Sequence, residues 1–162
     1  MRATEITTPM LLLSEQERQV VRAQVSQGLS DHEQKSYASA ARCFTQAAKL
    51  GHPVAQYVLG VYYASGTSVP KDEHMAFQLY LEAARHGNTA AQRRAGECYL
   101  TGRGVTADLE TGLAWLETAG QGGDAKACER LVQLYGSTKL RDGEKEAFWR
   151  ARLEELIEQS RE

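Results

Sequence analysis

Residues 88–123 read NTAAQRRAGECYLTGRGVTADLETGLAWLETAGQGG, and this stretch decides the fold because its pattern also occurs before and after it. The period is 36 residues, and the recurring positions are small or aromatic. They are Gly51, Gly87 and Gly123; Ala55, Ala91 and Ala127; and Tyr63, Tyr99 and Tyr135. A fixed period of this kind predicts a repeat protein, in which each unit packs on its neighbours.

Each unit is predicted to contain two helices. In the first full unit, Ala55, Leu59 and Tyr63 recur at helical spacing, and Ala76 and Tyr80 do so after a short break. The breaks contain residues that commonly cap helices at their N-termini, where a side-chain oxygen accepts free amide protons. These predicted N-caps are Asp72, Asn88, Asp108 and Asp124.

Glycine inside a helix needs a reason, because it lowers helix stability by up to about 1 kcal/mol relative to alanine. Gly60 and Gly96 occupy the same position in consecutive units. We therefore expect a neighbouring helix to approach too closely there for a side chain.

These motifs resemble the Sel1-like repeat, which is similar to the tetratricopeptide repeat. The residues that carry the resemblance are Ala91-Gln92, Gly96, Tyr99, Gly102-Arg103-Gly104-Val105, Asp108, Trp115 and Ala119. The resemblance implies an all-α fold, an α-α superhelix (solenoid) of helical hairpins with about eight helices. It also implies a protein that binds other proteins.

The period and its departures predict the domain organisation. Terminal units of stacked arrays differ from the consensus because they cover the exposed ends of the core. We expect a flexible N-terminus over residues 1–13 and one Sel1-like domain over residues 14–159. Within it we expect a capping pair over 14–50, full repeats over 51–86 and 87–122, and a degenerate repeat with a C-terminal cap over 123–159.

Three features of the predicted ends can be compared with the structure. A capping box of Ser14 and Glu17 and a valine stripe predict a helix from Glu15 to about Gln27, followed by a helix from Tyr37 to Leu50. The last helix is expected from Gly143 to Gln159. Its residues Phe148, Trp149, Leu153, Leu156 and Ile157 are predicted to face the stack. The loop of the first full unit has Ser68 where the next unit has Gly104, which predicts a different loop conformation.

Composition bears on the partners and the compartment. A net charge of −2 supplies no basic field for nucleic acid, and we expect no nucleic-acid partner and no membrane insertion. The longest apolar run near the start, residues 10–13, is too short for a signal-peptide core, which favours a cytoplasmic protein, of bacterial type by its resemblance. The odd number of cysteines favours reduced thiols at Cys43, Cys98 and Cys128.

Signs of catalysis are missing from the sequence. The four histidines have no two-ligand helical spacing, and neither a nucleophile elbow nor a phosphate-binding loop occurs. His52 and His86 are expected at helix ends, and the glycines of Gly102-Arg103-Gly104 belong to the repeat loop. We therefore expect a non-enzyme with no cofactor, no metal and no catalytic residue.

A binding surface is predicted on the first helix of each unit, on the concave side that the resemblance implies. Its residues lie opposite the small and apolar positions, and an arginine pair beside apolar and aromatic residues suits a peptide with an acidic group. An ordinary solvated face explains the same charges. The predicted partner-binding residues are Tyr57, Val58, Val61, Arg93, Arg94, Glu97, Glu129, Arg130 and Gln133.

The leading hypothesis is a non-catalytic adaptor, scaffold or regulator that binds a protein or peptide, with a secretion-system accessory or immunity role as one specialisation. One alternative is a hydrolase acting on cell-wall-related substrates, by analogy with secreted relatives of the family. Another is a self-assembling structural protein that docks through the end bearing Phe148 and Trp149. We expect a monomer or weak homodimer.

Overall fold

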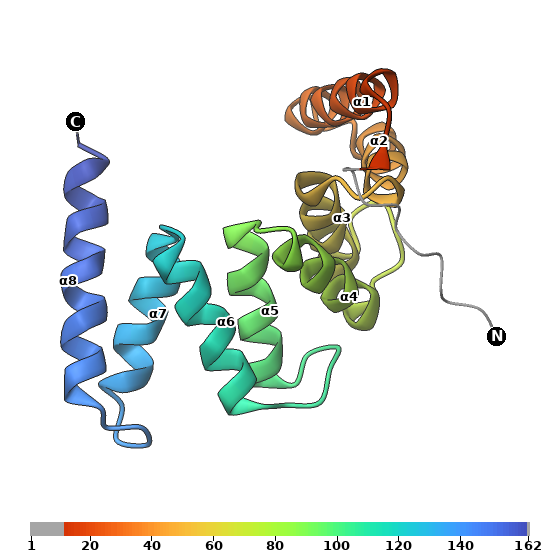
Figure 1. Cartoon of the computed structure of the whole chain (residues 1–162). Coiled ribbons are helices and arrows are strands. Elements are labelled where there is room, and N and C mark those ends of the chain that lie inside the picture. Colours follow the sequence, from red (N-terminus) through yellow and green to blue (C-terminus); the bar gives the residue numbers. More distant parts are fainter. Residues whose placement is uncertain (1–11, 162) are drawn as a thin grey trace. The chain divides into compact units, whose positions relative to one another are not determined.

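The protein is all-α in the part that the computed structural model describes, residues 12–161, which contains eight helices and no strand (Figure 1). This confirms the predicted fold class and helix number. The helices are α1 (Glu15–Glu33), α2 (Tyr37–Lys49), α3 (Pro53–Ser65), α4 (Glu73–Arg85), α5 (Thr89–Thr101), α6 (Leu109–Gln121), α7 (Ala125–Tyr135) and α8 (Gly143–Gln159).

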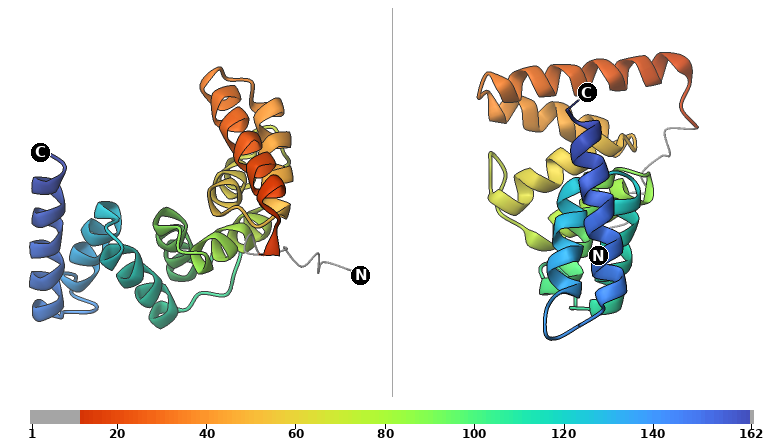
Figure 2. Two further views of the ribbon diagram at one scale, coloured as in Figure 1. Left: turned by 45° about the horizontal axis from the view of Figure 1, so that its top comes forward. Right: turned by 90° about the vertical axis from the view of Figure 1, so that its left-hand side faces the viewer.

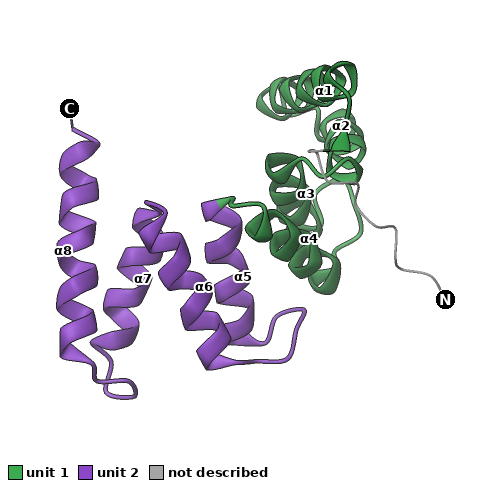
Figure 3. Cartoon of the chain, viewed as in Figure 1, with its two compact units in different colours: residues 1–88 green, residues 89–162 purple. Residues whose placement is uncertain are grey.

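Consecutive helices pack as hairpins, α1 with α2, α3 with α4, α5 with α6 and α7 with α8 (Figure 2). The chain divides into two compact units, Met1–Asn88 and Thr89–Glu162 (Figure 3). In the first unit α2 also packs against α3, and in the second α6 packs against α7. In each unit, therefore, the second helix of the first hairpin packs against the first helix of the second hairpin.

The core of the first unit lies between α1, α2 and α3. Val21 and Phe44 are completely buried there, and Leu59 is also buried. Tyr62 is 2% exposed, whereas the predicted core residue Tyr63 is only half-buried at the edge of the same cluster. The 36-residue pattern points to Tyr63 because Tyr62 has no aromatic counterpart one period later.

Helix α1 is six residues longer than predicted, because Gly28 does not end it. A Cβ atom at Gly28 would lie 2.9 Å from the Phe44 ring, so the glycine allows α1 to approach α2 closely. The chain instead turns at Lys35, whose φ is 60°. The same reason explains Gly60 and Gly96, where a Cβ atom would lie 2.7 Å from the Tyr80 ring and 2.9 Å from a backbone oxygen of α6.

The predicted N-caps are confirmed at three positions. The carboxylates of Asp72, Asp108 and Asp124 accept hydrogen bonds from the backbone N–H three residues later. Ser14 and Glu17 form the predicted capping box. Asn88 directly precedes α5, and its role as a cap stays a prediction.

The two repeat loops have the same backbone conformation, contrary to the prediction. Ser68 has a φ of 58° and Gly104 a φ of 71°, both in the left-handed region. Gly66 and Gly102 also correspond, with φ values of 74° and 72°. Ser68 therefore adopts a conformation that favours glycine.

Helix α8 covers the core of the second unit mainly through Trp149, which is 3% exposed. Leu153 and Leu156 pack against the same cluster as predicted. The prediction is wrong for Phe148 and Ile157, whose side chains are 58% and 39% exposed. They lie on opposite flanks of the helix, about 100° and 80° from Trp149 at 100° per residue.

A polar cluster also holds α8 in the second unit. The Tyr135 hydroxyl donates a hydrogen bond to Glu117 Oε1 at 2.6 Å and accepts one from Lys145 Nζ at 3.2 Å. Burial, more than these bonds, raises the pKa of Tyr135. The cluster ties α6, α7 and α8 together.

The remaining predictions on the chain ends and thiols have mixed outcomes. The predicted flexible N-terminus falls mostly outside the described residues, but Leu13 is buried in the core of the first unit. No disulfide joins Cys43, Cys98 or Cys128. Across residues 12–161, no helix is both long and apolar enough to cross a membrane.

Candidate interaction surface

The predicted surface residues come from the same turns of α3, α5 and α7. These three helices each open a hairpin, and their small side chains Ala55, Ala91 and Ala127 are completely buried. The predicted surface residues lie on other sides of the same helices, two to six positions further along.

In the first unit, the predicted residues of α3 are partly engaged with the core. Val58 packs against the core cluster and is half-buried. The Tyr57 ring centroid lies 6.0 Å from that of Tyr80 on α4. Val61 is half-buried, and Val54 on the same helix is 37% exposed. The face of α3 is therefore apolar, with much of its area covered by its own unit.

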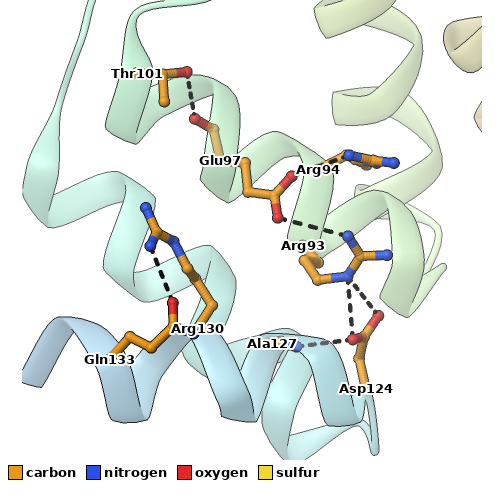
Figure 4. A network of polar contacts seen from close by, with 8 residues as sticks. All are labelled: Arg93, Arg94, Glu97, Thr101, Asp124, Ala127, Arg130 and Gln133. Carbon is orange, nitrogen blue, oxygen red and sulfur yellow. Dashed lines mark hydrogen bonds and ion pairs between the residues drawn. The ribbon is translucent and has the colours of Figure 1, made fainter.

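In the second unit, Arg93 is a buried side chain with a fixed partner. Its Nε donates to Oδ1 and Oδ2 of Asp124 at 3.1 and 3.2 Å, and both side chains are only 10% exposed (Figure 4). The same carboxylate accepts a hydrogen bond from the backbone N–H of Ala127 at 2.9 Å. Arg93 thus joins α5 to the N-terminus of α7.

Arg94 and Glu97 are more exposed than Arg93. Their side chains are 43% and 32% exposed, and Arg94 donates a hydrogen bond to Glu97 Oε2 at 3.2 Å. An Arg93 terminal nitrogen lies 3.6 Å from Glu97 Oε1. Both oxygens of the Glu97 carboxylate therefore face an arginine.

The predicted residues of α7 form the other side of this surface. Arg130 donates a hydrogen bond to the Gln133 side chain at 3.3 Å, and Gln133 and Glu129 are exposed. Figure 4 shows Arg130 and Gln133 on α7 in the same view as the α5 residues. The second unit therefore carries six of the nine predicted residues, on α5 and α7, and the Arg93–Asp124 ion pair joins α5 to the start of α7.

Asp124 was predicted only as a helix cap, and its pairing with Arg93 was missed. The two residues are 31 positions apart, so no helical spacing relates them. The available signal was the repeat register, since the cap of each first helix lies next to the preceding unit. Asp124 is the feature that fixes Arg93 in place.

His52 is the most buried of the four histidines, since His32, His74 and His86 are all exposed. It directly precedes α3 and is half-buried. Burial, and then the positive charge of Arg22, lower the pKa of His52. His86 ends α4, as predicted. Within residues 12–161, no three His, Cys, Asp or Glu side chains are grouped closely enough to hold a metal ion.

Comparisons with known proteins agree with this architecture. A family model described as Sel1 repeat matches residues 26–52, 53–88 and 89–124. The crystal structure of a Sel1 repeat protein from Oxalobacter formigenes is similar over 86% of the chain, with a TM-score of 0.77 and 27% sequence identity. No curated protein matches the sequence.

A second solved structure is that of a protective antigen present in uropathogenic Escherichia coli strains, which displays an SLR fold. It is similar over 85% of the chain, with a TM-score of 0.76 and 28% identity. The chain spans 60% of the first of these structures and 31% of the second. The family resemblance inferred from the repeat motifs is confirmed.

Proposed function

Because the chain belongs to the Sel1 repeat family, whose members are generally protein-interaction modules, we propose that it is an adaptor, scaffold or regulator that binds another protein or peptide. The fold is typical of non-catalytic scaffolds, and the proposed role needs no cofactor. The proposed activity is recognition of a partner.

The observation that carries this proposal is the contrast between two sets of positions in the repeat. The completely buried position of Ala55 keeps the same residue in the next two first helices, as Ala91 and Ala127. The position three residues later is partly exposed in all three helices, and it changes from Val58 to Arg94 and Arg130. A constant packing position near a variable, partly exposed one favours a scaffold whose surface chemistry is adapted to a partner.

The proposed contact residues of the second unit are those that combine exposure with polar chemistry. Arg94, Glu97, Arg130, Gln133 and Glu129 meet both conditions. Arg93 is buried and its charge is paired with Asp124, so we assign it a structural role under this surface. Partial exposure of Arg94 leaves part of its guanidinium accessible to a carboxylate.

The first unit contributes an apolar face in this proposal. Val54, Tyr57, Val58 and Val61 lie on α3, and their partial exposure supplies contact area. Apolar and aromatic side chains carry much of the energy in protein interfaces. We assign to this face a supporting role, since its side chains also pack within the unit.

Affinity capture from the native cell tests the proposal. The protein is compared with a variant carrying Arg94→Glu and Arg130→Glu, and bound proteins are identified by mass spectrometry. Charge reversal on the surface should abolish capture of one specific protein, because carboxylates there repel an acidic group and cannot donate hydrogen bonds.

A matched control reverses two exposed cations of the same unit outside the surface, Lys139→Glu and Arg150→Glu. This control should retain the partner, and circular dichroism should show unchanged helicity in both variants. If the surface variant and the control variant both lost the partner, the change in net charge would explain the loss. Retention in both would refute a role for α5 and α7.

A further inference from the structure

Glu97 lies between the two arginines of α5. Its Oε1 is 3.6 Å from a terminal nitrogen of Arg93, and its Oε2 accepts a hydrogen bond from Arg94 at 3.2 Å (Figure 4). One carboxylate is thus shared by two guanidinium groups. A carboxylate of an acidic ligand would seek the same nitrogen atoms.

The contacts of Glu97 are long and near solvent. Charge-assisted N–H···O bonds are typically about 2.7–2.9 Å, shorter than both distances at Glu97. The Glu97 and Arg94 side chains are 32% and 43% exposed. The exposed Arg94–Glu97 pair contributes little stability, and the buried Arg93 keeps its Asp124 partner, so Glu97 can leave the arginines at small cost.

Arg93 is held much more firmly than Glu97. Its Nε contacts both Asp124 oxygens, and the two side chains are each 10% exposed. Asp124 is itself fixed by the N–H of Ala127. Moving Arg93 would leave a buried charge without its partner, which is costly. The Arg93 nitrogen that faces Glu97 therefore stays in position if Glu97 moves away.

We infer that Glu97 is an internal competitor, which occupies the Arg93–Arg94 pair in the free protein and is displaced by a carboxylate of an acidic partner segment. This inference rests on the proposed function and adds the chemistry of the partner. Glu97 sets the affinity, since its negative charge competes for the same two guanidinium groups. An uncharged residue of the same size at this position strengthens binding of an acidic segment.

A titration of the full chain with a blocked tetraglutamate peptide at low ionic strength tests this inference. The side-chain Nε–Hε NMR signals of Arg93 and Arg94 report on the site directly. Glu97→Gln is compared with wild type and with Glu154→Gln, which removes the same charge from an exposed position on α8, outside the proposed surface. A blocked tetraglutamine peptide is the control ligand.

Removing a competing exposed ion pair should make tetraglutamate bind about two- to fivefold more tightly to Glu97→Gln than to wild type. Glu154→Gln should bind like wild type, and tetraglutamine should leave the arginine signals unchanged. Equal affinity of wild type and Glu97→Gln would overturn the competitor role, as would an equal gain in Glu154→Gln.

Failure of this inference is separable from failure of the proposed function. Arg94 signals that do not respond to tetraglutamate in any variant would overturn the acidic chemistry assigned to the partner. The Arg94→Glu and Arg130→Glu variant also removes the hydrogen-bond donors of both arginines, so its affinity capture detects a partner that contacts them whether or not that partner is acidic. It decides on its own whether the surface binds a protein.

Discussion

Asp124 performs two tasks with one carboxylate. It caps α7 by accepting the N–H of Ala127, and it neutralises the buried guanidinium of Arg93. Asp108 caps α6 through Thr111 but has no ion pair, and its hydrogen bonds to Thr111 lower its pKa. Comparing the two aspartates therefore separates what an N-cap and what a buried ion pair contribute to the free energy of unfolding.

Asp124→Ala should lower the free energy of unfolding by about 3–5 kcal/mol, because it leaves the buried Arg93 guanidinium with only its long contact to Glu97. Asp108→Ala should cost clearly less, because it removes an N-cap alone. Urea denaturation followed by circular dichroism measures both. Equal costs would show that the Arg93 ion pair adds nothing to the cap.

Ser68 holds a left-handed conformation that an L-residue adopts at a cost. Ser68→Gly should therefore raise the free energy of unfolding by about 0.5–1 kcal/mol, after allowing for the greater chain entropy of glycine in the unfolded state. The reciprocal change Gly104→Ser should lower it by a similar amount. Thermal denaturation of both variants checks the signs, and a destabilised Ser68→Gly would contradict the loop geometry.

His52 should make the stability depend on pH. Burial lowers its pKa in the folded state, so the unfolded chain takes up a proton more readily. The contribution of His52 is fully present above its ordinary pKa of about 6.5 and is lost as the pH falls from there through the folded-state pKa.

Urea denaturation at pH 7.5, 6.5 and 5.0 tests this prediction, with His52→Asn as the variant that does not titrate. The loss of stability on acidification should be smaller in His52→Asn than in wild type. The same loss in both proteins would assign the pH dependence to other groups.

Among the elements, α8 shows how one residue can anchor a whole helix. Trp149 is buried in the core of the second unit, whereas its neighbour Phe148 is 58% exposed. The Tyr135 hydroxyl, bonded to Glu117 and Lys145, adds a polar attachment. The apolar attachment through Trp149 is the larger one, since it buries a whole indole ring.

Trp149→Ala should lower the free energy of unfolding by about 3–5 kcal/mol, as expected for a large aromatic side chain removed from a core. Phe148→Ala should cost well under 1 kcal/mol, because little of its surface is buried. Chemical denaturation measures both values. Comparable costs would contradict the orientation of α8.

Helix boundaries were predictable from the sequence where local chemistry sets them. The aspartate caps and the repeat glycines place the starts of α4, α6 and α7 correctly. The end of α1 was missed because Gly28 matches the glycine that commonly ends a helix. The glycine instead allows close packing against the Phe44 ring, a tertiary contact that the local sequence does not reveal. Phe148 was misplaced because residues at the flank of an apolar stripe fit either environment.

The sequence predicts which residues of the candidate surface share a helix and a repeat position, but not which side chains contact one another. Spacing alone puts Arg93, Arg94 and Glu97 on one helix, and the period relates them to Glu129 and Arg130. Which arginine is buried depends on the Asp124 carboxylate, 31 residues from Arg93 in the chain. That pairing follows from the packing of α6 and α7 in the second unit.

At the scale of the whole molecule, each unit has its own core and its own surface chemistry. The first unit presents an apolar face on α3, and the second presents a charged face on α5 and α7. The recurring small residues build both cores, and the variable positions differ between the units. We propose that this variable face of the second unit binds a protein partner.

Site-specific photo-crosslinking in the native cell tests whether this face contacts a partner. A benzoylphenylalanine is placed at Gln133, exposed on α7, or at Ala151, exposed on α8. We expect a crosslink to one specific protein from position 133 and none from position 151. A crosslink from position 151 alone, or the same products from both positions, would contradict it.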